Sequence, residues 1–238
     1  MAEPAIKHAL ADPIGLARRQ LQVILALDCS GSMSGDRIAS LNYALRTTLP
    51  ELRKVAEENP EIDVRMRVLR FSTEAEWHVA DPVAVGDLRW TDLTAGGETS
   101  MGAAFRMMGE VLRAEAMPGR QLPPVLVLAS DGYPTDDFEE GLKTFFEADH
   151  ASSAIRLAIA IGGEADMAVL ERFIRHPTLR PLRANSASDL VRHIKWATTA
   201  PVKTASSPTN APDPLAPLAE RTVQEAAASA SDVSDIIW

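Results

Sequence analysis

The stretch Leu21-Gln-Val-Ile-Leu-Ala-Leu-Asp-Cys-Ser-Gly-Ser32 joins an apolar run directly to a polar loop. A short, nearly continuous apolar run is typical of a strand that is covered on both faces, as in a parallel sheet. Asp28 stands at the carboxyl end of the run, and Ser30 and Ser32 follow it at alternate positions. This order predicts a buried parallel strand whose carboxyl end carries oxygen-bearing side chains.

Strands and helices are predicted to alternate along the rest of the chain. Apolar or alternating runs predict strands at 62–71, 76–80, 124–129, 154–161 and 179–182, of which 76–80 returns antiparallel at an edge. Helical spacing of apolar residues predicts helices at 36–59, 100–116, 138–150, 167–175 and 188–198. Asp36 is expected to cap the first helix, and Pro50 to bend or break it. The rhythm predicts an α/β fold: a doubly wound, Rossmann-like three-layer sandwich with a mostly parallel sheet and one antiparallel edge strand.

The composition divides the chain into four parts. An N-terminal extension at 1–18 precedes the predicted domain at 19–200, and a flexible linker rich in Pro, Ala and Ser is predicted at 201–217. An acidic tail follows at 218–238 and ends in Ile236, Ile237 and Trp238. Large apolar residues beside acids fit a short segment that docks on a partner, and the alternatives are a frayed tail or one folded back on its own domain.

The overall composition is that of a globular protein with a sizeable core. Hydrophobic residues make up 46% and charged residues 24% of the 238 residues. The formal net charge of -9 argues against binding to nucleic acid or to an anionic membrane, because like charges repel. The single Cys29 cannot form an internal disulfide, and neither a membrane-spanning run nor an export signal is recognisable. We therefore expect a cytoplasmic protein.

Three polar clusters fall at the edge of the sheet where ligands of doubly wound folds gather. They are Asp28-Cys-Ser-Gly-Ser32, Gly96-Gly-Glu-Thr-Ser100 and Ser130-Asp-Gly132. All of their useful ligand atoms are oxygens, and the scattered histidines show no ligand spacing. Hydroxyl and carboxylate oxygens suit a hard cation, for which Mg²⁺ is the first candidate and Mn²⁺ or Ca²⁺ are alternatives.

The clusters together resemble the metal-ion-dependent adhesion site (MIDAS) of von Willebrand factor A domains, a family with a Rossmann-like sheet. The resemblance spans roughly residues 21–198. It implies a five-residue metal site made of Asp28, Ser30, Ser32, Thr99 and Asp131, in which Ser130 is not included. In the family the two serines and the threonine contact the metal directly, and the two aspartates do so directly or through water. An acidic side chain of a partner protein commonly fills the open coordination position.

Two stretches are also similar to the bacterial TerY-like branch of the family, which is associated with tellurite resistance and stress responses. They are Leu128-Ala-Ser-Asp-Gly-Tyr-Pro-Thr-Asp136 and Thr99-Ser-Met-Gly-Ala-Ala104. This similarity implies a bacterial protein whose partner is a kinase or a metal-dependent protein phosphatase.

The middle cluster departs from the family pattern at one position. Two glycines often precede the threonine directly, but here Glu98 stands between Gly97 and Thr99. Either Glu98 replaces the second glycine, or Ser100 shares the ligand role. Glu98 is also a candidate for contact with the partner.

Each cluster has a simpler interpretation when it is taken alone. Asp-x-Ser-x-Ser and Asp-Gly occur in ordinary turns, and a threonine after glycines often caps a helix. Their joint order and spacing favour a functional site. Cys29 is expected to pack under the loop, and a redox role beside the metal is the alternative.

The competing function is that of an enzyme. Asp28 could attack phosphate with Mg²⁺ nearby, as in a phosphatase or phosphotransferase. Such an enzyme would normally carry a second carboxylate two residues on and a lysine near a later strand, but position 30 is Ser and no lysine lies between Lys54 and Lys143. Walker-type and Gly-x-Ser-x-Gly motifs are also missing. The sequence therefore predicts a metal-dependent protein-binding module without catalysis of its own.

Overall fold

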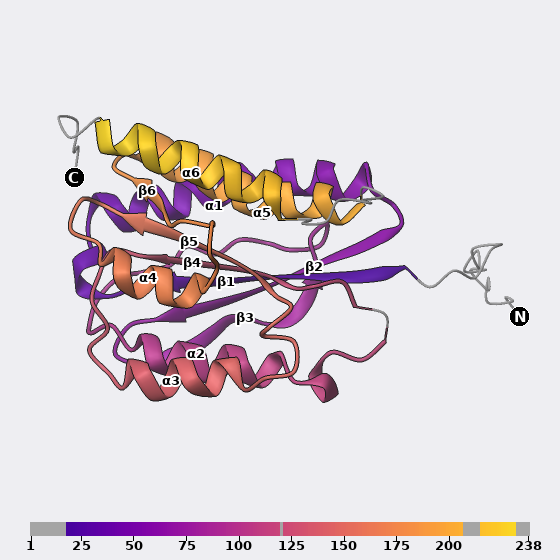
Figure 1. Cartoon of the computed structure of the whole chain (residues 1–238), viewed down its shortest axis with the longest axis horizontal. Helices are drawn as coiled ribbons and strands as arrows, with labels where there is room; N and C mark the ends of the chain where they lie inside the picture. The colour runs from indigo at the N-terminus through magenta and orange to yellow at the C-terminus, as the bar shows by residue number, and fades with distance from the viewer. Residues whose placement is uncertain (1–17, 120, 207–214, 232–238) are drawn as a thin grey trace, which may run out of the picture.

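A six-stranded sheet forms the middle layer of the molecule (Figure 1). The computed structural model describes residues 18–119, 121–206 and 215–231. The strand order is β3-β2-β1-β4-β5-β6, and every neighbouring pair is parallel except β2 and β3. The strands are β1 (Arg19–Asp28), β2 (Ile62–Phe71), β3 (Ala75–Ala84), β4 (Val125–Ser130), β5 (Ile155–Ile161) and β6 (Leu182–Ala184). The predicted fold class is thus confirmed, including the antiparallel edge strand.

Helices cover both faces of this sheet. On one face α1 (Asp36–Glu57) packs against α5 (Ala187–Ser206), and α6 (Ala216–Ser231) runs along α5 in the outer part of the same layer (Figure 1). On the other face lie α2 (Met101–Val111), α3 (Phe138–Phe146) and α4 (Met167–Ile174). These three helices share an aromatic cluster in which the rings of Phe105 and Phe173 stack with centroids 5.4 Å apart. Short 3₁₀ turns occur at Gly31–Met33 (η1) and Ala114–Ala116 (η2).

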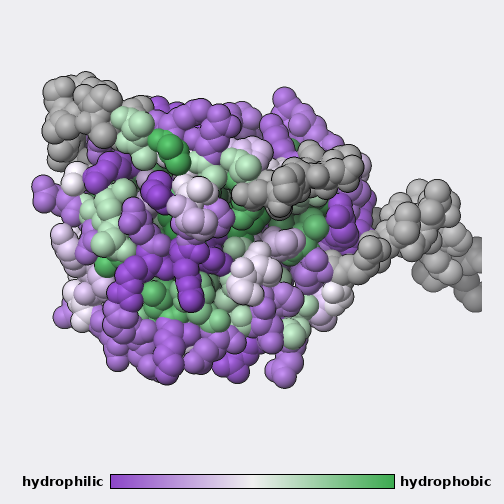
Figure 2. Space-filling model, viewed as in Figure 1, coloured by the Kyte–Doolittle hydropathy of each residue, from purple (hydrophilic) through white to green (hydrophobic). Residues whose placement is uncertain are grey.

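The core follows the apolar runs of the sequence. All residues of β4 and β5 are buried, and so are those of β1 from Leu21 onward, because helices cover both faces of these strands. β2 alternates buried and half-buried positions, as its alternating sequence predicts. The outer surface of α2 and α3 is largely hydrophilic, as the lower edge of Figure 2 shows. No helix of the described part of the chain is long and apolar enough to cross a membrane.

Several predicted element boundaries differ from those in the structure. Gly35 and not Asp36 is the N-cap of α1, and the helix continues unbroken past Pro50. The long helix predicted at 100–116 ends at Val111, with η2 after it. β6 begins at Leu182, because Leu179 is buried outside the strand and the pairing with β5 starts only opposite Ile159.

The C-terminal part differs most from the prediction. Helix α5 continues through the first residues of the predicted linker as far as Ser206, because Val202 is fully buried and fixes this turn in the core. The start of the predicted tail is helical, since α6 buries Leu218 and Thr222 against the domain. Residues 207–214 and 232–238, with the candidate docking residues Ile236, Ile237 and Trp238, lie outside the described residues.

Candidate functional site

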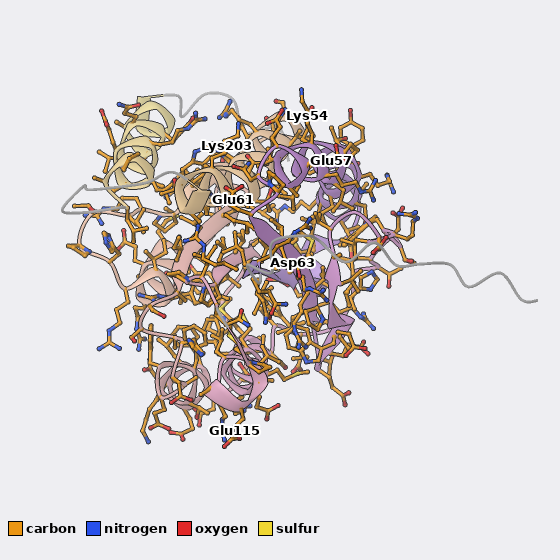
Figure 3. All side chains as sticks on the ribbon, turned by 90° about the vertical axis from the view of Figure 1, so that its right-hand side faces the viewer. Lys54, Glu57, Glu61, Asp63, Glu115 and Lys203 are labelled. Atoms are coloured by element: carbon orange, nitrogen blue, oxygen red, sulfur yellow. The ribbon has the colours of Figure 1, made fainter. Side chains whose placement is uncertain are left out.

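The candidate site lies where the central strands β1 and β4 end. Leu27 pairs with Ala129, so that Asp28 and Ser130 end the two strands side by side. Because the strands are parallel, the loops that follow them leave the sheet at the same edge. Figure 3 shows the opposite end of the molecule, where Asp63 lies near the start of β2. The polar clusters predicted from the sequence therefore share one end of the fold.

Asp28 is fully buried and is held by donors on both carboxylate oxygens. The Ser30 amide donates to Oδ1 at 2.9 Å, and the Ser130 hydroxyl donates to Oδ2 at 2.5 Å. Burial raises the pKa of the Asp28 carboxyl above its usual value, and the charge of Asp131 adds to this. The hydrogen bonds from Ser130 and Ser30 act in the other direction and favour the charged form.

A chain of hydrogen bonds links the first loop to Asp131. The hydroxyl oxygens of Ser30 and Ser32 lie 3.0 Å apart, and Ser30 is the donor because the one proton of Ser32 goes to Asp131. The Ser32 hydroxyl donates to Oδ1 of Asp131 at 2.7 Å. The second carboxylate oxygen of Asp131 accepts a hydrogen bond from the guanidinium of Arg37. The three residues from the first and third clusters are thus in direct contact.

Backbone hydrogen bonds fix the middle cluster to the first loop. The Gly31 amide donates to the Gly97 carbonyl at 2.9 Å, and the Gly96 amide donates to the Cys29 carbonyl at 2.8 Å. Gly97 has a φ of 84°, and a Cβ there would lie 2.2 Å from the hydroxyl oxygen of Thr73. A glycine is therefore required at position 97 for the close approach of this loop.

Thr99 faces the same point as Ser32. Its Oγ1 lies 3.7 Å from the place that a Cβ on Gly132 would occupy, and the Ser32 hydroxyl oxygen lies 3.8 Å from that place. The Thr99 amide is held by the Thr135 hydroxyl at 3.0 Å. The five predicted residues therefore lie at one location, and the middle loop contributes the Thr99 hydroxyl.

Ser100 is directed elsewhere. Its hydroxyl donates to the Thr73 carbonyl at 2.8 Å, so its proton is used within the middle loop's own contacts. Of the two alternatives that the sequence left open, the geometry favours Thr99 as the middle ligand. Glu98 is exposed, and its amide donates to the Thr73 hydroxyl at 3.3 Å. Glu98 thus stands where the family often has a second glycine, and the Thr99 hydroxyl still lies near Gly132 and Ser32.

The donor set fits a small, hard cation better than a soft one. Two buried carboxylates and three hydroxyls supply only oxygen, which Mg²⁺, Mn²⁺ and Ca²⁺ prefer. Within the described ranges, no cluster of three or more His, Cys, Asp and Glu side chains is placed to hold a metal, so hydroxyl ligands would have to complete this site. Asp28 and Asp131 carry two negative charges against the single positive charge of Arg37. The three side chains together are therefore net negative, which favours a cation at this place.

Two residues outside the five-residue set support the site, and one of them, Arg37, was missed from the sequence. Ser130 was left outside the five-residue set, yet it donates to Asp28. Arg37 lies in the first turn of α1 and pairs with Asp131, which is 94 positions away in the chain. The position of Ser130 at a strand end beside Asp28 was a usable signal. Nothing in the sequence around Arg37 pointed to this contact.

Cys29 packs under the loop as expected. Its side chain is fully buried, and burial, with a smaller effect from Asp28, raises the pKa of the thiol to about 12. A thiol that stays protonated at neutral pH is a poor nucleophile, which disfavours the redox alternative.

Comparisons with known proteins identify the family and the fold of the chain. The family model described as the von Willebrand factor type A domain matches residues 22–194. No curated protein sequence matches the chain. Among solved structures, a von Willebrand factor type A protein from Catenulispora acidiphila is similar with a TM-score of 0.54 and 18% identity, over 77% of this chain and 42% of that one.

Two further structures have the same fold. The D319A mutant of the PilB minor pilin from Streptococcus sanguinis is similar with a TM-score of 0.59 and 14% identity, over 82% of this chain and 64% of that one. Proximal thread matrix protein 1 from the mussel byssus, solved with a zinc-occupied MIDAS motif, has a TM-score of 0.55 and 13% identity, over 78% of this chain and 46% of that one. The chain thus spans less than two thirds of these proteins. It belongs to the von Willebrand factor type A domain family.

Proposed function

We propose that this protein is a binding module that holds one divalent metal ion and uses it to bind a partner protein. Asp28, Ser30, Ser32, Thr99 and Asp131 would hold the ion, with Mg²⁺ as the first candidate. The ion would supply a positive charge with an open coordination position for an acidic side chain of the partner. This is a MIDAS-type function, and the protein would have no catalysis of its own.

One observation carries the proposal: oxygen donors from three loops meet at one end of the sheet. Ser30, Ser32 and Asp131 form a continuous hydrogen-bonded chain, and Thr99 faces the same point as Ser32. Buried carboxylates so close together repel each other unless a cation or donors compensate them. The zinc-occupied MIDAS of the mussel byssus protein supports a divalent ion on this fold.

The surface around the site supports recognition of a protein. Ser32, which contacts Asp131, is exposed, and so is Glu98, the neighbour of Thr99 in the chain, so a partner can approach from solvent. Tyr133 is 63% exposed two residues after Asp131. Exposed tyrosines are common in protein interfaces, because the ring offers apolar area together with a polar end. These residues would surround the partner's acidic side chain.

The enzymatic alternative has less support from the same geometry. A nucleophilic Asp28 would need an oxygen free to attack phosphate, but Oδ1 and Oδ2 both accept hydrogen bonds and the residue is fully buried. The sequence also has no lysine between Lys54 and Lys143, so neither the middle cluster nor the third cluster carries one. Phosphatase activity is therefore an outcome to be tested, and our proposal excludes it.

The finer parts of the proposal come from the sequence. The stretches around Asp131 and Thr99 favour a TerY-like protein in a bacterial tellurite or stress-response system. A kinase or a metal-dependent protein phosphatase would then be the partner. A cytoplasmic location fits the single, buried Cys29.

Titration calorimetry with Mg²⁺ tests the metal site. We expect the full-length protein to bind Mg²⁺, and Asp28→Asn and Asp131→Asn each to weaken binding by about 10- to 100-fold, because each removes a charged ligand. Asp63→Asn is the matched control. It removes a carboxylate at the opposite end of the molecule (Figure 3), where Asp63 pairs with Arg65, and should leave binding unchanged.

Two results would count against the proposal. Equal Mg²⁺ binding by the wild type, Asp28→Asn and Asp63→Asn would place the ion elsewhere. Hydrolysis of a phosphate ester by the wild type, lost in Asp28→Asn, would establish the enzymatic alternative in its place. Titration of Mn²⁺ and Ca²⁺ on the same proteins identifies the preferred ion.

A further inference from the structure

Arg37 places a positive charge inside the candidate metal site. Its guanidinium pairs with Oδ2 of Asp131, and the same nitrogen lies 3.4 Å from the Ser32 carbonyl oxygen. The Asp131 side chain has no exposed surface, whereas that of Arg37 is 21% exposed. The pair is therefore shielded from water on the carboxylate side and open on the guanidinium side.

The fold makes room for this guanidinium. Gly162 directly follows β5, and a Cβ at this position would lie 3.0 Å from Nη2 and 3.3 Å from Cζ of Arg37. The missing side chain of Gly162 thus lets Arg37 lie between the start of α1 and the end of β5. A larger residue at 162 would push the guanidinium away from Asp131.

Position 37 is otherwise unfavourable for a cation. The first turn of a helix carries exposed amide groups and a partial positive charge, so arginine is disfavoured there. Asp36 in the same turn matches the helix preference, but Arg37 does not. The carboxylate of Asp131 compensates this charge. The contact with Asp131, and not the stability of α1, therefore explains why an arginine stands at position 37.

A divalent ion and Arg37 would act on the same carboxylate. In the present arrangement Asp131 accepts from Ser32 on one oxygen and from Arg37 on the other. An ion held by Ser32 and Asp131 would stand close to the guanidinium, and two cations at short range repel each other strongly in a partly buried site. Binding of the ion must therefore work against the charge of Arg37.

We propose that Arg37 is a built-in counter-cation of Asp131 that competes with the divalent metal ion. In the metal-free protein it neutralises the buried carboxylate and keeps the loops together. Metal binding is coupled to the release of Arg37 from Asp131, and this lowers the apparent affinity for the ion. The inference rests on the proposed function, since it requires that the site binds a metal.

Mg²⁺ titration of the full-length wild type, Arg37→Gln and Arg46→Gln tests the competition. Arg37→Gln should bind Mg²⁺ about tenfold more tightly, which corresponds to about 1.4 kcal/mol, because the competing charge is gone. Arg46→Gln is the matched control, since Arg46 is an exposed arginine of the same helix that pairs with Asp92. Its affinity should equal that of the wild type.

Thermal unfolding gives a second measurement on the same proteins. Without metal, Arg37→Gln should unfold at a lower temperature than Arg46→Gln, because Asp131 has lost its counter-cation. Saturating Mg²⁺ should raise its midpoint by more than that of the wild type. If Arg37→Gln folds poorly, Arg37→Lys keeps the charge on a differently shaped group and should bind Mg²⁺ within about twofold of the wild type.

The outcomes separate this inference from the proposed function. If the wild type binds Mg²⁺ and Arg37→Gln binds it equally or more weakly, the competition is refuted while the metal site stands. If neither protein binds a divalent ion, the proposed function fails and the inference fails with it. Binding by Arg37→Gln alone would show that Arg37 blocks the site, the strongest form of the competition.

Discussion

The two aspartates of the site have the same chemistry but different surroundings. Asp28 is satisfied by neutral donors, the Ser130 hydroxyl and the Ser30 amide. Asp131 is satisfied by one hydroxyl, from Ser32, and by the cation Arg37. A buried carboxylate without donors or a counter-charge is strongly destabilising. This division lets two carboxylates stay buried close together, with only one of them neutralised by a side chain.

Cys29 gives a prediction about a single residue beside the site. With its thiol pKa raised to about 12 and its side chain fully buried, it should not react with a thiol reagent at mildly alkaline pH in the native protein. After denaturation in guanidinium chloride the single cysteine should react fully. A colorimetric disulfide reagent measures both states. Rapid reaction of the native protein would show that the loop opens often enough to expose the thiol.

At the scale of elements, the sequence predicts buried strands well and element ends poorly. β1, β4 and β5 are apolar runs, and their burial depends on local composition that can be recognised directly. The end of α5 depends instead on Val202, whose burial follows from the packing of the whole domain. The hydroxyls of Thr199 and Thr204 donate to carbonyls one turn earlier, so these polar groups are satisfied within the helix. The Pro- and Ser-rich composition that predicted a linker carries none of this information.

The residues of the site could likewise be predicted only where a local pattern in the sequence marks them. Asp28, Ser30 and Ser32 lie within one loop, and their alternation could be recognised in the sequence. Thr99 and Asp131 could be added because the loops follow predicted strands or helices in a regular order. Arg37 could not, because its contact with Asp131 depends on the space above Gly162 and on the orientation of α1. A contact between side chains of distant elements, such as Arg37 and Asp131, leaves no pattern in the sequence around either residue.

Helix α1 provides a prediction at this scale. Pro50 lies inside the helix at an exposed position. Because proline has no backbone N–H, it cannot donate a hydrogen bond to the Arg46 carbonyl. Pro50→Ala should restore that bond and stabilise the protein by about 2 kcal/mol, after allowance for the greater freedom of the unfolded chain. Denaturant unfolding followed by circular dichroism measures the change. Thr47→Ala, at an exposed position of the same helix, should change stability by less than about 0.7 kcal/mol.

A loss of stability in Pro50→Ala would have a definite meaning. It would show that the surroundings have adapted to the missing hydrogen bond, for example through the packing of Leu49 and Leu52 on the core. The interruption would then be part of how α1 is shaped over the sheet.

At the scale of the molecule, the two ends of the sheet are separated in their roles. The carboxyl ends of β1 and β4 carry the candidate site, while the end with Glu57, Glu61 and Asp63 carries charged residues of α1 and the start of β2 (Figure 3). Helix α6 belongs to neither end. It lies along α5 and beside β6, the edge strand, where it covers the outer part of one layer (Figure 1). We therefore expect α6 to be part of the folded unit.

The attachment of α6 gives the last prediction. Leu218 is 3% exposed and Thr222 is fully buried, with the Thr222 hydroxyl accepting from the Arg180 amide, so this face of the helix is packed. Leu218→Ala should destabilise the protein by about 2 to 3 kcal/mol in denaturant unfolding, because it leaves a gap between α6 and the domain. Val223→Ala is the matched control on the other face, where Val223 is 47% exposed, and should cost less than about 0.5 kcal/mol. Equal, small effects of both substitutions would mean that α6 detaches in solution and adds nothing to the stability of the domain.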